Sequence, residues 1–269
     1  MTDLAAHIDA CWEEKKKPDI QMLSTIIMQL DQGKLRIASK ENGHWKTHPW
    51  LKKAILLFFK YTTSKRLGSE NFPFYDKAPL KCAGWRSADF EKALFRMAPG
   101  AVVRRGAFVG KSVVLMPCFV NIGAFIDNGT MIDTMARVGS CAQVGKNCHI
   151  AAGVGIGGVL EPPQANPVII EDDCFIGAQS QIVEGAKIGK GAIIGMGTLI
   201  GGSTKIIDRI TGKVTFGEVP EGAVVVPGSY QTTEKISLRC AVIIKKVDES
   251  ARQKTSINDL LRDQTANDS

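Results

Sequence analysis

Apolar residues recur at every sixth position through the middle of the chain, between Val102 and Asp208. The first run comprises Val102, Phe108, Val114, Val120, Ile126, Ile132, Val138, Val144, Ile150 and Ile156. Four positions after most of them lies a small or compact residue: Gly106, Ser112, Cys118, Ala124, Thr130, Ala136, Ala142, Cys148 and Val154. After residues 157–167 the pattern resumes two positions later as Ile170, Ile176, Ile182, Ile188, Ile194, Ile200 and Ile206. A six-residue period is typical of a hexapeptide parallel β-helix, and it matches neither an amphipathic helix nor an alternating strand.

Three hexapeptides make one triangular coil, so equivalent positions recur about every eighteen residues and neighbouring coils lie about 4.8 Å apart. The repeat therefore predicts a prism of about five to six coils. We expect the branched residue of each hexapeptide to point into the prism and the small residue to permit the corner. Residues 157–167 interrupt this repeat, and so long a loop is expected to be either functional or flexible.

The rest of the chain predicts covers for the two ends of the prism, whose strand edges would otherwise be exposed. We expect a mainly β protein with a mostly helical domain at 1–100, the β-helix at 101–230, and a short C-terminal strand and helix at 231–269. Helical apolar spacing and turn signals predict the following N-terminal elements: two helices within 2–30 separated near Pro18, a hairpin at 35–45, a helix at 47–64, a loop at 66–83 and a helix at 87–97. After Asp208 we expect a short hairpin, an irregular last coil, a strand at 237–247 and a helix at 256–263.

Composition excludes several classes of protein. The longest apolar run, Ala54–Phe59, is too short to cross a bilayer, and the chain does not open on a secretory signal, so we expect a cytoplasmic protein without a membrane partner. Seven cysteines without a CxxC pair argue against a disulfide framework or a zinc ribbon, and no metal is expected. The net charge of +7 comes from scattered Lys and Arg, which does not indicate nucleic acid and also suits small anionic substrates.

Several stretches are more specific than the bare repeat. They are 50–57 (WLKKAILL), 95–108 (FRMAPGAVVRRGAF), 114–134, 138–167 (with GSCAQVGKN and GVGIGGVLEP), 172–178 (DDCFIGA) and 240–248. Together they resemble the tetrahydrodipicolinate N-succinyltransferases of the hexapeptide-repeat acyltransferase superfamily. The resemblance implies a left-handed β-helix and a homotrimer with active sites between subunits.

The same resemblance implies a reaction. The family transfers succinyl from succinyl-CoA to the amine of L-2-amino-6-oxopimelate, the opened form of tetrahydrodipicolinate, in lysine and diaminopimelate biosynthesis. Succinyl-CoA would be a co-substrate, and no permanently bound cofactor is expected. An amine that attacks a thioester must lose a proton to a base, and the oxyanion needs preorganised donors. A dicarboxylate acceptor also needs cations, best an arginine fork.

Asp133 and Arg96 match the family's acceptor-site residues. Asp133, in MIDT, would contact or orient the acceptor amine, although this position after an inward Ile also takes ordinary turn residues such as Asp127. Arg96, in FRM, would clamp a substrate carboxylate, although an arginine at a helix end is also favoured by the helix dipole alone.

The chain departs from the family at one catalytic position. Gln181, in GAQSQIVEG, stands where the family has a glutamate, and a glutamine binds substrate but cannot act as a general base. Three possibilities stay open: Asp133 acts with water alone, Glu184 takes the role, or the activity is altered.

The resemblance places CoA along the outer wall of the coils. Gly177, Ala178, Gly195 and Gly197 would leave room for the pantetheine arm, and Lys205 or Arg209 would hold its 3′-phosphate. These glycines are also ordinary corner residues. We expect the loop at 157–167 to fold over the bound CoA and exclude water.

Two rival functions remain. Many hexapeptide acyltransferases use a histidine base, so His149 would make the chain an acetyl-CoA-dependent acyltransferase. A zinc site of three histidines is disfavoured, because His149 is the only histidine in the repeat. The other rival, a non-catalytic β-helix scaffold, requires neither the long loop nor the helical domain.

Overall fold

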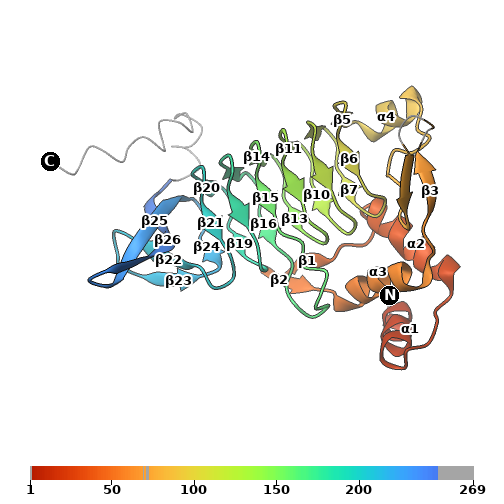
Figure 1. Cartoon of the computed structure of the whole chain (residues 1–269), viewed down its shortest axis with the longest axis horizontal. Coiled ribbons are helices and arrows are strands. Elements are labelled where there is room, and N and C mark those ends of the chain that lie inside the picture. Colours follow the sequence, from red (N-terminus) through yellow and green to blue (C-terminus); the bar gives the residue numbers. More distant parts are fainter. Residues whose placement is uncertain (1, 69, 71–72, 248–269) are drawn as a thin grey trace.

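The structure, a computed structural model, describes residues 2–68, 70 and 73–247. It is a three-faced prism of stacked parallel strands, with helices at its N-terminal end and a long hairpin at its C-terminal end (Figure 1). The mainly β class and the parallel β-helix with a helical N-terminal domain are therefore confirmed.

Each coil passes through the three faces in turn, which we call the first, second and third face. The first face stacks β5 (Arg96–Met97), β8 (Val114–Leu115), β11 (Met131–Ile132), β14 (His149–Ile150), β17 (Phe175–Ile176) and β20 (Ile193–Ile194). The second stacks β6 (Val102–Val103), β9 (Phe119–Val120), β12 (Arg137–Val138), β15 (Gly155–Ile156), β18 (Gln181–Ile182) and β21 (Leu199–Ile200). The third stacks β7 (Phe108–Val109), β10 (Phe125–Ile126), β13 (Gln143–Val144), β16 (Ile169–Ile170), β19 (Lys187–Ile188) and β24 (Glu218–Val219).

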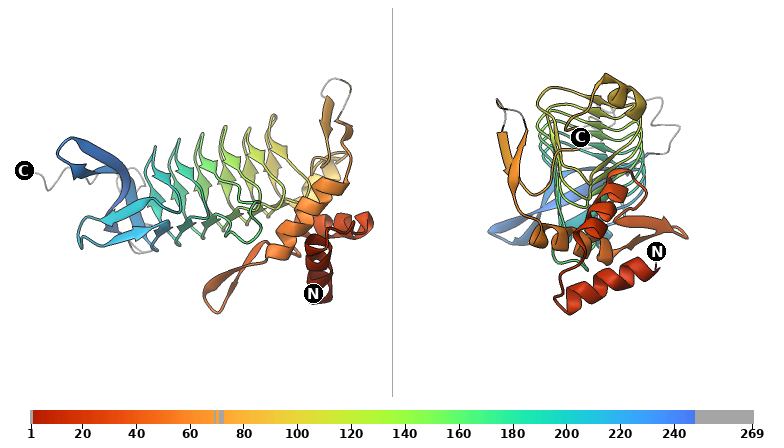
Figure 2. Two further views of the ribbon diagram at one scale, coloured as in Figure 1. Left: turned by 60° about the horizontal axis from the view of Figure 1, so that its bottom comes forward. Right: turned by 90° about the vertical axis from the view of Figure 1, so that its right-hand side faces the viewer.

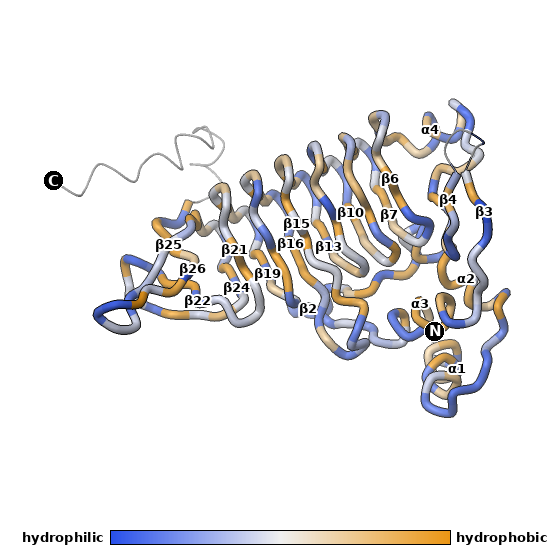
Figure 3. Tube along the Cα trace, in the orientation of Figure 1, coloured by the Kyte–Doolittle hydropathy of each residue, from blue (hydrophilic) through white to orange (hydrophobic). Residues whose placement is uncertain are grey.

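The second residue of each of these strands points into the prism. From Val120 onward these are the predicted inward residues, and Ile126, Ile150 and Ile176 are all fully buried. The two-residue phase shift is also confirmed, because Ile156 lies on the second face and Ile170 on the third. Figure 3 shows the resulting succession of apolar and polar stretches along the coils.

The predicted phase of the first three hexapeptides is wrong by one residue. Val103, Val109 and Leu115 are the buried members of their strands, whereas Val102, Phe108 and Val114 are only half-buried. Each of these strands consists of two adjacent apolar residues, so the sequence fits either phase. The small positions are shifted in the same way, because Ala107 and Val113 are fully buried, whereas Gly106 and Ser112 just before them adopt positive φ, at 91° and 58°.

The N-terminal domain has its own hydrophobic core. Its elements are α1 (Thr2–Glu13), α2 (Ile20–Asp31), β1 (Ala38–Glu41), β2 (His44–Thr47), α3 (Pro49–Tyr61), β3 (Lys65–Gly68), β4 (Pro73–Asp76) and α4 (Ser87–Ala93). The predicted helices within 2–30, the hairpin turning at Asn42-Gly43 and the helix near 47–64 are confirmed. In the end-on view of Figure 2 the β1–β2 and β3–β4 hairpins extend on opposite sides of the helices.

Two predictions in this domain are wrong. The expected loop at 66–83 contains the β3–β4 hairpin, in which Pro73 occupies the first position of its strand and so costs no interior hydrogen bond. The helix expected at 87–97 ends at Ala93, because Leu94 adopts the left-handed conformation with φ 59°. Arg96 consequently lies on β5 of the prism rather than at a helix end.

Polar contacts dock this domain on the third face of the prism. Arg36 Nε donates to Gln143 Oε1 at 2.7 Å, and its guanidinium stacks over the Phe125 ring at 3.9 Å. Trp45 Nε1 donates to Glu171 Oε1 at 2.7 Å. Ile122 and Cys141 of the prism join the apolar core of the helical domain. The domain and the prism therefore share one packed boundary.

The C-terminal end is a hairpin longer than predicted. β22 (Lys205–Asp208) and β23 (Val214–Phe216) form the expected short hairpin, and the strand expected at 237–247 lies within β26 (Ile236–Lys246). The irregular coil expected before it is instead largely β25 (Ala223–Thr233), which pairs in parallel with β20 and antiparallel with β26. The expected boundary at residue 230 therefore falls inside β25. The helix expected at 256–263 lies outside the described residues.

The helices and the cysteines bear on membrane insertion and on disulfide formation. None of the helices in the described part of the chain is long and apolar enough to span a membrane. Cys11, Cys82, Cys118, Cys141, Cys148 and Cys240 form no disulfide. Burial raises the pKa of the Cys118 and Cys141 thiols to about 12, so both remain neutral and pack as small apolar residues.

The corrected phase of the first coils predicts unequal effects of two neighbouring truncations. Leu115→Ala removes a fully buried side chain and should lower the free energy of unfolding by about 2–5 kcal/mol, whereas Val114→Ala on the outer side should cost clearly less. Chemical denaturation of both variants measures the difference. An equal or larger cost for Val114→Ala would contradict this phase.

Candidate active site

Backbone stacking brings distant residues together along the edge between the first and second faces, which we call the first edge. Each coil contributes the residue that follows its first-face strand. Asp133 N donates to Ile150 O at 2.9 Å, Ala151 N to Ile176 O at 3.0 Å, and Gly177 N to Ile194 O at 2.8 Å. Asp133, Ala151, Gly177 and Gly195 therefore form one line. The structure thus places Asp133 on the same edge as the predicted CoA wall.

Asp133 is held by its own turn. Its Oδ1 accepts hydrogen bonds from the Thr134 backbone N–H at 2.6 Å and from Thr134 Oγ1 at 3.2 Å. Its other oxygen, Oδ2, lies 3.8 Å from His149 Nε2 of the next coil, and 31% of the Asp133 side chain is exposed. Oδ1 is therefore fixed by the turn, while Oδ2 lies toward His149.

His149 lies beside this carboxylate without a hydrogen bond to it. The ring sits edge-on to Phe175, with centroids 5.4 Å apart. Within the described part of the chain, its Nε2 atom is shielded from solvent and has no hydrogen-bond partner. A separation of 3.8 Å is too long for a hydrogen bond, but catalytic hydrogen bonds often shorten when substrate binds. His149 is therefore placed to exchange or share a proton with Asp133.

Gln181 pairs with an arginine on the second face. Arg137 Nη2 donates to Gln181 Oε1 at 2.6 Å across Gly155, which lies between them in the column of strands. A Cβ at Gly155 would lie 2.1 Å from Gln181 Oε1 and 2.8 Å from Arg137 Nη2. Only glycine therefore permits this contact. Sequence reasoning missed Arg137, although its spacing of one coil from Gly155 could have revealed the column.

Two predicted residues do not meet Asp133 within one chain. Arg96 is exposed on β5, and in the outward column of the first face Val114 and Met131 separate it from His149. Glu184 is exposed at the edge between the second and third faces, in a left-handed turn with φ 55°. A single prism therefore carries the two catalytic carboxylate candidates on different edges.

The residues predicted to bind CoA divide into two groups. Gly177, Ala178, Gly195 and Gly197 follow the first edge as expected, and Gly177 has no room for a side chain because a Cβ would lie 2.6 Å from Met196 N. Lys205 Nζ instead sits 4.0 Å from the Tyr230 ring centroid, and Arg209 Nε donates to Ile244 O at 2.9 Å.

A pocket of about 480 Å³ lies at the C-terminal end of this edge. Gly197, Leu199, Thr204, Arg239 and Cys240 are among its lining residues, whereas Lys205 and Arg209 are not. Arg239 therefore supplies the cation at this pocket. Sequence reasoning missed it, because its position depends on the long-range pairing of β25 with β26.

The long loop at 157–167 runs from β15 of the second face to β16 of the third. The helical domain holds it there: Lys52 Nζ donates to Ala165 O at 2.6 Å, and Thr47 Oγ1 to Asn166 Oδ1 at 2.9 Å. Burial lowers the pKa of Lys52, whose side chain is fully buried. The loop thus lies at a different edge from the Gly177–Gly197 wall of its own chain.

Comparisons with known proteins agree with this architecture. A family model described as "Tetrahydrodipicolinate N-succinyltransferase N-terminal" matches residues 3–61, and one described as "Hexapeptide repeat of succinyl-transferase" matches residues 167–201. The chain is 52% identical to the 2,3,4,5-tetrahydropyridine-2,6-dicarboxylate N-succinyltransferase of Caulobacter vibrioides, over 98% of this chain and 100% of that protein. It is 54% identical to the protein of the same name from Cupriavidus metallidurans, over 97% and 98% of the two chains. The chain belongs to the tetrahydrodipicolinate N-succinyltransferase family.

A solved structure supports the fold of this family member. A Campylobacter jejuni protein, described as a candidate 2,3,4,5-tetrahydropyridine-2-carboxylate N-succinyltransferase, aligns with a TM-score of 0.58 at 19% identity. The alignment covers 83% of this chain and 62% of that one. At this identity the likeness concerns the fold alone.

Because Arg137 and Gln181 meet across Gly155, the effect on stability of adding a side chain at Gly155 should depend on whether these two side chains are present. Gly155→Ala should lower the free energy of unfolding by no more than about 1 kcal/mol, because the new Cβ displaces only the flexible ends of Gln181 and Arg137 and breaks their exposed hydrogen bond. In an Arg137→Ala/Gln181→Ala background the same substitution should cost much less, since the overlapping atoms are gone. Chemical denaturation of the four proteins measures this coupling, and an equal cost in both backgrounds would refute the packing.

Proposed function

We propose that this family member transfers succinyl from succinyl-CoA to the amine of L-2-amino-6-oxopimelate, giving N-succinyl-2-amino-6-oxopimelate and CoA in lysine and diaminopimelate biosynthesis. The observation that carries the proposal is the identity of 51–54% with relatives named for N-succinyl transfer to this dicarboxylate, over 96–98% of the chain. The first edge supplies the chemistry: a carboxylate, a neighbouring histidine and a wall of small residues in one line.

In this reaction the amine nitrogen forms a bond to the thioester carbonyl, and the carbon–sulfur bond breaks. The nitrogen loses a proton, and the departing thiolate gains one. We assign the contact with the amine to Asp133, whose side chain is partly exposed on the first edge. His149 is the group nearest to this oxygen that can carry the proton onward, since an imidazole both accepts and donates protons near neutral pH.

Gln181 is proposed to bind substrate rather than to accept a proton. Its Oε1 accepts from Arg137, so the side-chain amide nitrogen is directed to other acceptors, such as a carboxylate oxygen. Arg137 adds a cation beside it. Arg96 remains a proposed carboxylate clamp. Glu184 remains a proposed catalytic residue, and that role requires a site formed between protomers.

We propose a CoA path along Gly177, Ala178, Gly195 and Gly197 toward the C-terminal hairpin. The Arg239 guanidinium at the end of this path would bind the phosphates of CoA, and Lys205 and Arg209 are the other proposed cations. The low wall suits an extended pantetheine arm, because a side chain at Gly197, where a Cβ meets nothing within 4 Å, would project into the open space beside the wall.

We further propose a left-handed prism, a homotrimer and a cytoplasmic location. The trimer is supported by the distribution of the candidate residues, because Arg96 and Glu184 can approach Asp133 only from a second protomer. The first edge is also open on one side, since 31% of the Asp133 side chain is exposed in the single chain. A neighbouring prism packed along this edge would enclose the site.

The proposal predicts acceptor-dependent release of free thiol from succinyl-CoA, measured with L-2-aminopimelate as a stable acceptor and with acetyl-CoA as the competing donor. Faster release from succinyl-CoA, only in the presence of acceptor, is the expected result. A clear preference for acetyl-CoA would favour the alternative acetyltransferase. No release from either donor would refute the proposed activity.

A further inference from the structure

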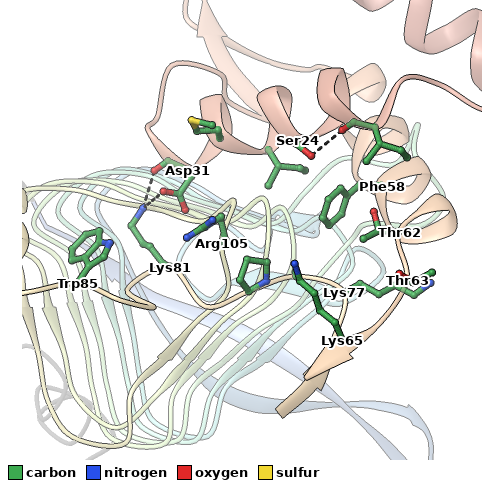
Figure 4. Close-up of a pocket in the computed structure, with 15 residues that line it drawn as sticks. Ser24, Asp31, Phe58, Thr62, Thr63, Lys65, Lys77, Lys81, Trp85 and Arg105 are labelled. Carbon is green, nitrogen blue, oxygen red and sulfur yellow. Dashed lines mark hydrogen bonds and ion pairs between the residues drawn. The ribbon is translucent and has the colours of Figure 1, made fainter. Parts of the chain in front are cut away.

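A second cavity lies far from the first edge, between the helical domain and the first coil of the prism. Its volume is about 600 Å³, which is within the range of small-molecule sites. α2, α3, β3 and the segment between β4 and α4 surround it, and Arg105 of the first coil lies between Lys81 and Lys77 (Figure 4). None of the residues proposed for acyl transfer lines it.

The cavity is strongly cationic. Lys65, Lys77, Lys81 and Arg105 line it, and Asp31 is the only carboxylate among its described lining residues. The Asp31–Lys81 pair lies at one end beside Trp85, and Lys65 and Lys77 lie at the other end (Figure 4).

Both carboxylate oxygens of Asp31 accept hydrogen bonds from the protein, whereas the ammonium groups of two lysines keep N–H donors that these contacts do not occupy. Asp31 Oδ2 accepts from Lys81 Nζ at 2.8 Å, and its Oδ1 accepts from Gly106 N at 2.9 Å. Lys81, only 6% exposed, also donates to Asp31 O at 2.9 Å, which leaves one of its three N–H donors for another acceptor. Lys77 Nζ donates to Phe59 O and likewise retains donors. The cavity therefore lacks anionic groups to match its donors.

Its walls are apolar and contain a further unsatisfied hydroxyl. Ile20, Ile27, Met28, Phe58 and Trp85 supply the apolar surface. Thr62 Oγ1 is shielded from solvent and has no hydrogen-bond partner among the described residues. The ligand-facing character of the cavity therefore rests on its apolar walls and on the spare N–H donors of Lys77 and Lys81.

We propose that this cavity binds a small organic anion, a carboxylate or phosphate carried on an apolar body. The anionic group would be bound by Lys77 and Lys65 at one end of the cavity, with Arg105 between them and Lys81 at the other end. The apolar body would pack against Phe58, Ile27 and Trp85. Inorganic phosphate lacks the apolar part and a neutral aromatic lacks the charge, so neither uses both features of the cavity.

The test uses the full-length protein with phenylphosphate and benzoate as probes, titrated by isothermal calorimetry. Inorganic phosphate and phenol serve as the charge-only and apolar-only controls. At least one organic anion should bind at least about tenfold more tightly than both controls. Comparing the two probes identifies which anionic group the cavity prefers. Equal binding of inorganic phosphate or of phenol, or no binding of either probe, would overturn the proposal.

A matched pair of variants locates the binding. Lys65→Gln/Arg105→Gln removes two exposed cavity cations, and Lys34→Gln/Arg66→Gln removes two exposed cations outside the cavity, so both double variants have the same net charge. The first pair should weaken probe binding by about tenfold or more, and the second should leave it unchanged. Equal effects would show binding elsewhere, including at the proposed CoA path. Thiol release from succinyl-CoA should stay normal in both, and this readout keeps failure of the cavity distinct from failure of the proposed acyl transfer.

Discussion

The structure depends on the stacking of one coil on the next. In each strand the backbone bonds to the equivalent strands above and below, and the inward branched side chain packs on its counterparts, as Ile132, Ile150 and Ile176 do on the first face. A parallel ladder of this kind fixes the position of every residue in its column, because a slip by one residue would exchange inward and outward side chains. The outward residues are therefore positioned as rigidly as the core, although they belong to strands only two residues long.

This constraint explains how the candidate site is assembled. Asp133, Gly177 and Gly195 lie far apart in the sequence, yet the ladder sets them on one edge. The same rule places Arg137, Gly155 and Gln181 in one column, where the missing side chain of the middle residue lets the outer two meet. Small residues thus have two functions on this prism: they permit corners, and at Gly155 the missing side chain leaves room for a contact along the wall. The cationic cavity at the N-terminal end has a different origin, since it forms where the helical domain packs against the first coil.

Periodicity alone predicts the prism, its corners and the shift after the long loop, because each depends on local spacing. It does not determine the phase where two apolar residues are adjacent, as in Val102-Val103 and Val114-Leu115, since both phases bury an apolar side chain. It also misses structure that depends on distant pairing, such as β25 and the position of Arg239. The family resemblance named Asp133 as an acceptor-site residue, and the structure places it on the first edge. It could not reveal that Glu184 lies on another edge or that Arg137 contacts Gln181. Both facts depend on which residues of this chain the stacked strands place above one another.

The most direct measurement compares two aspartates in the same local setting. Asp133 and Asp127 each follow an inward isoleucine, and each accepts a hydrogen bond from the next backbone N–H, at 2.6 Å and 2.8 Å. Only Asp133 lies on the first edge, because Asp127 follows β10 of the third face.

Succinyl-CoA-dependent thiol release should therefore fall by about 10²-fold or more in Asp133→Asn and stay near normal in Asp127→Asn, with similar thermal stability in both. A near-normal rate for Asp133→Asn, or an equal loss in both variants, would contradict the assignment of the acyl-transfer site to the first edge.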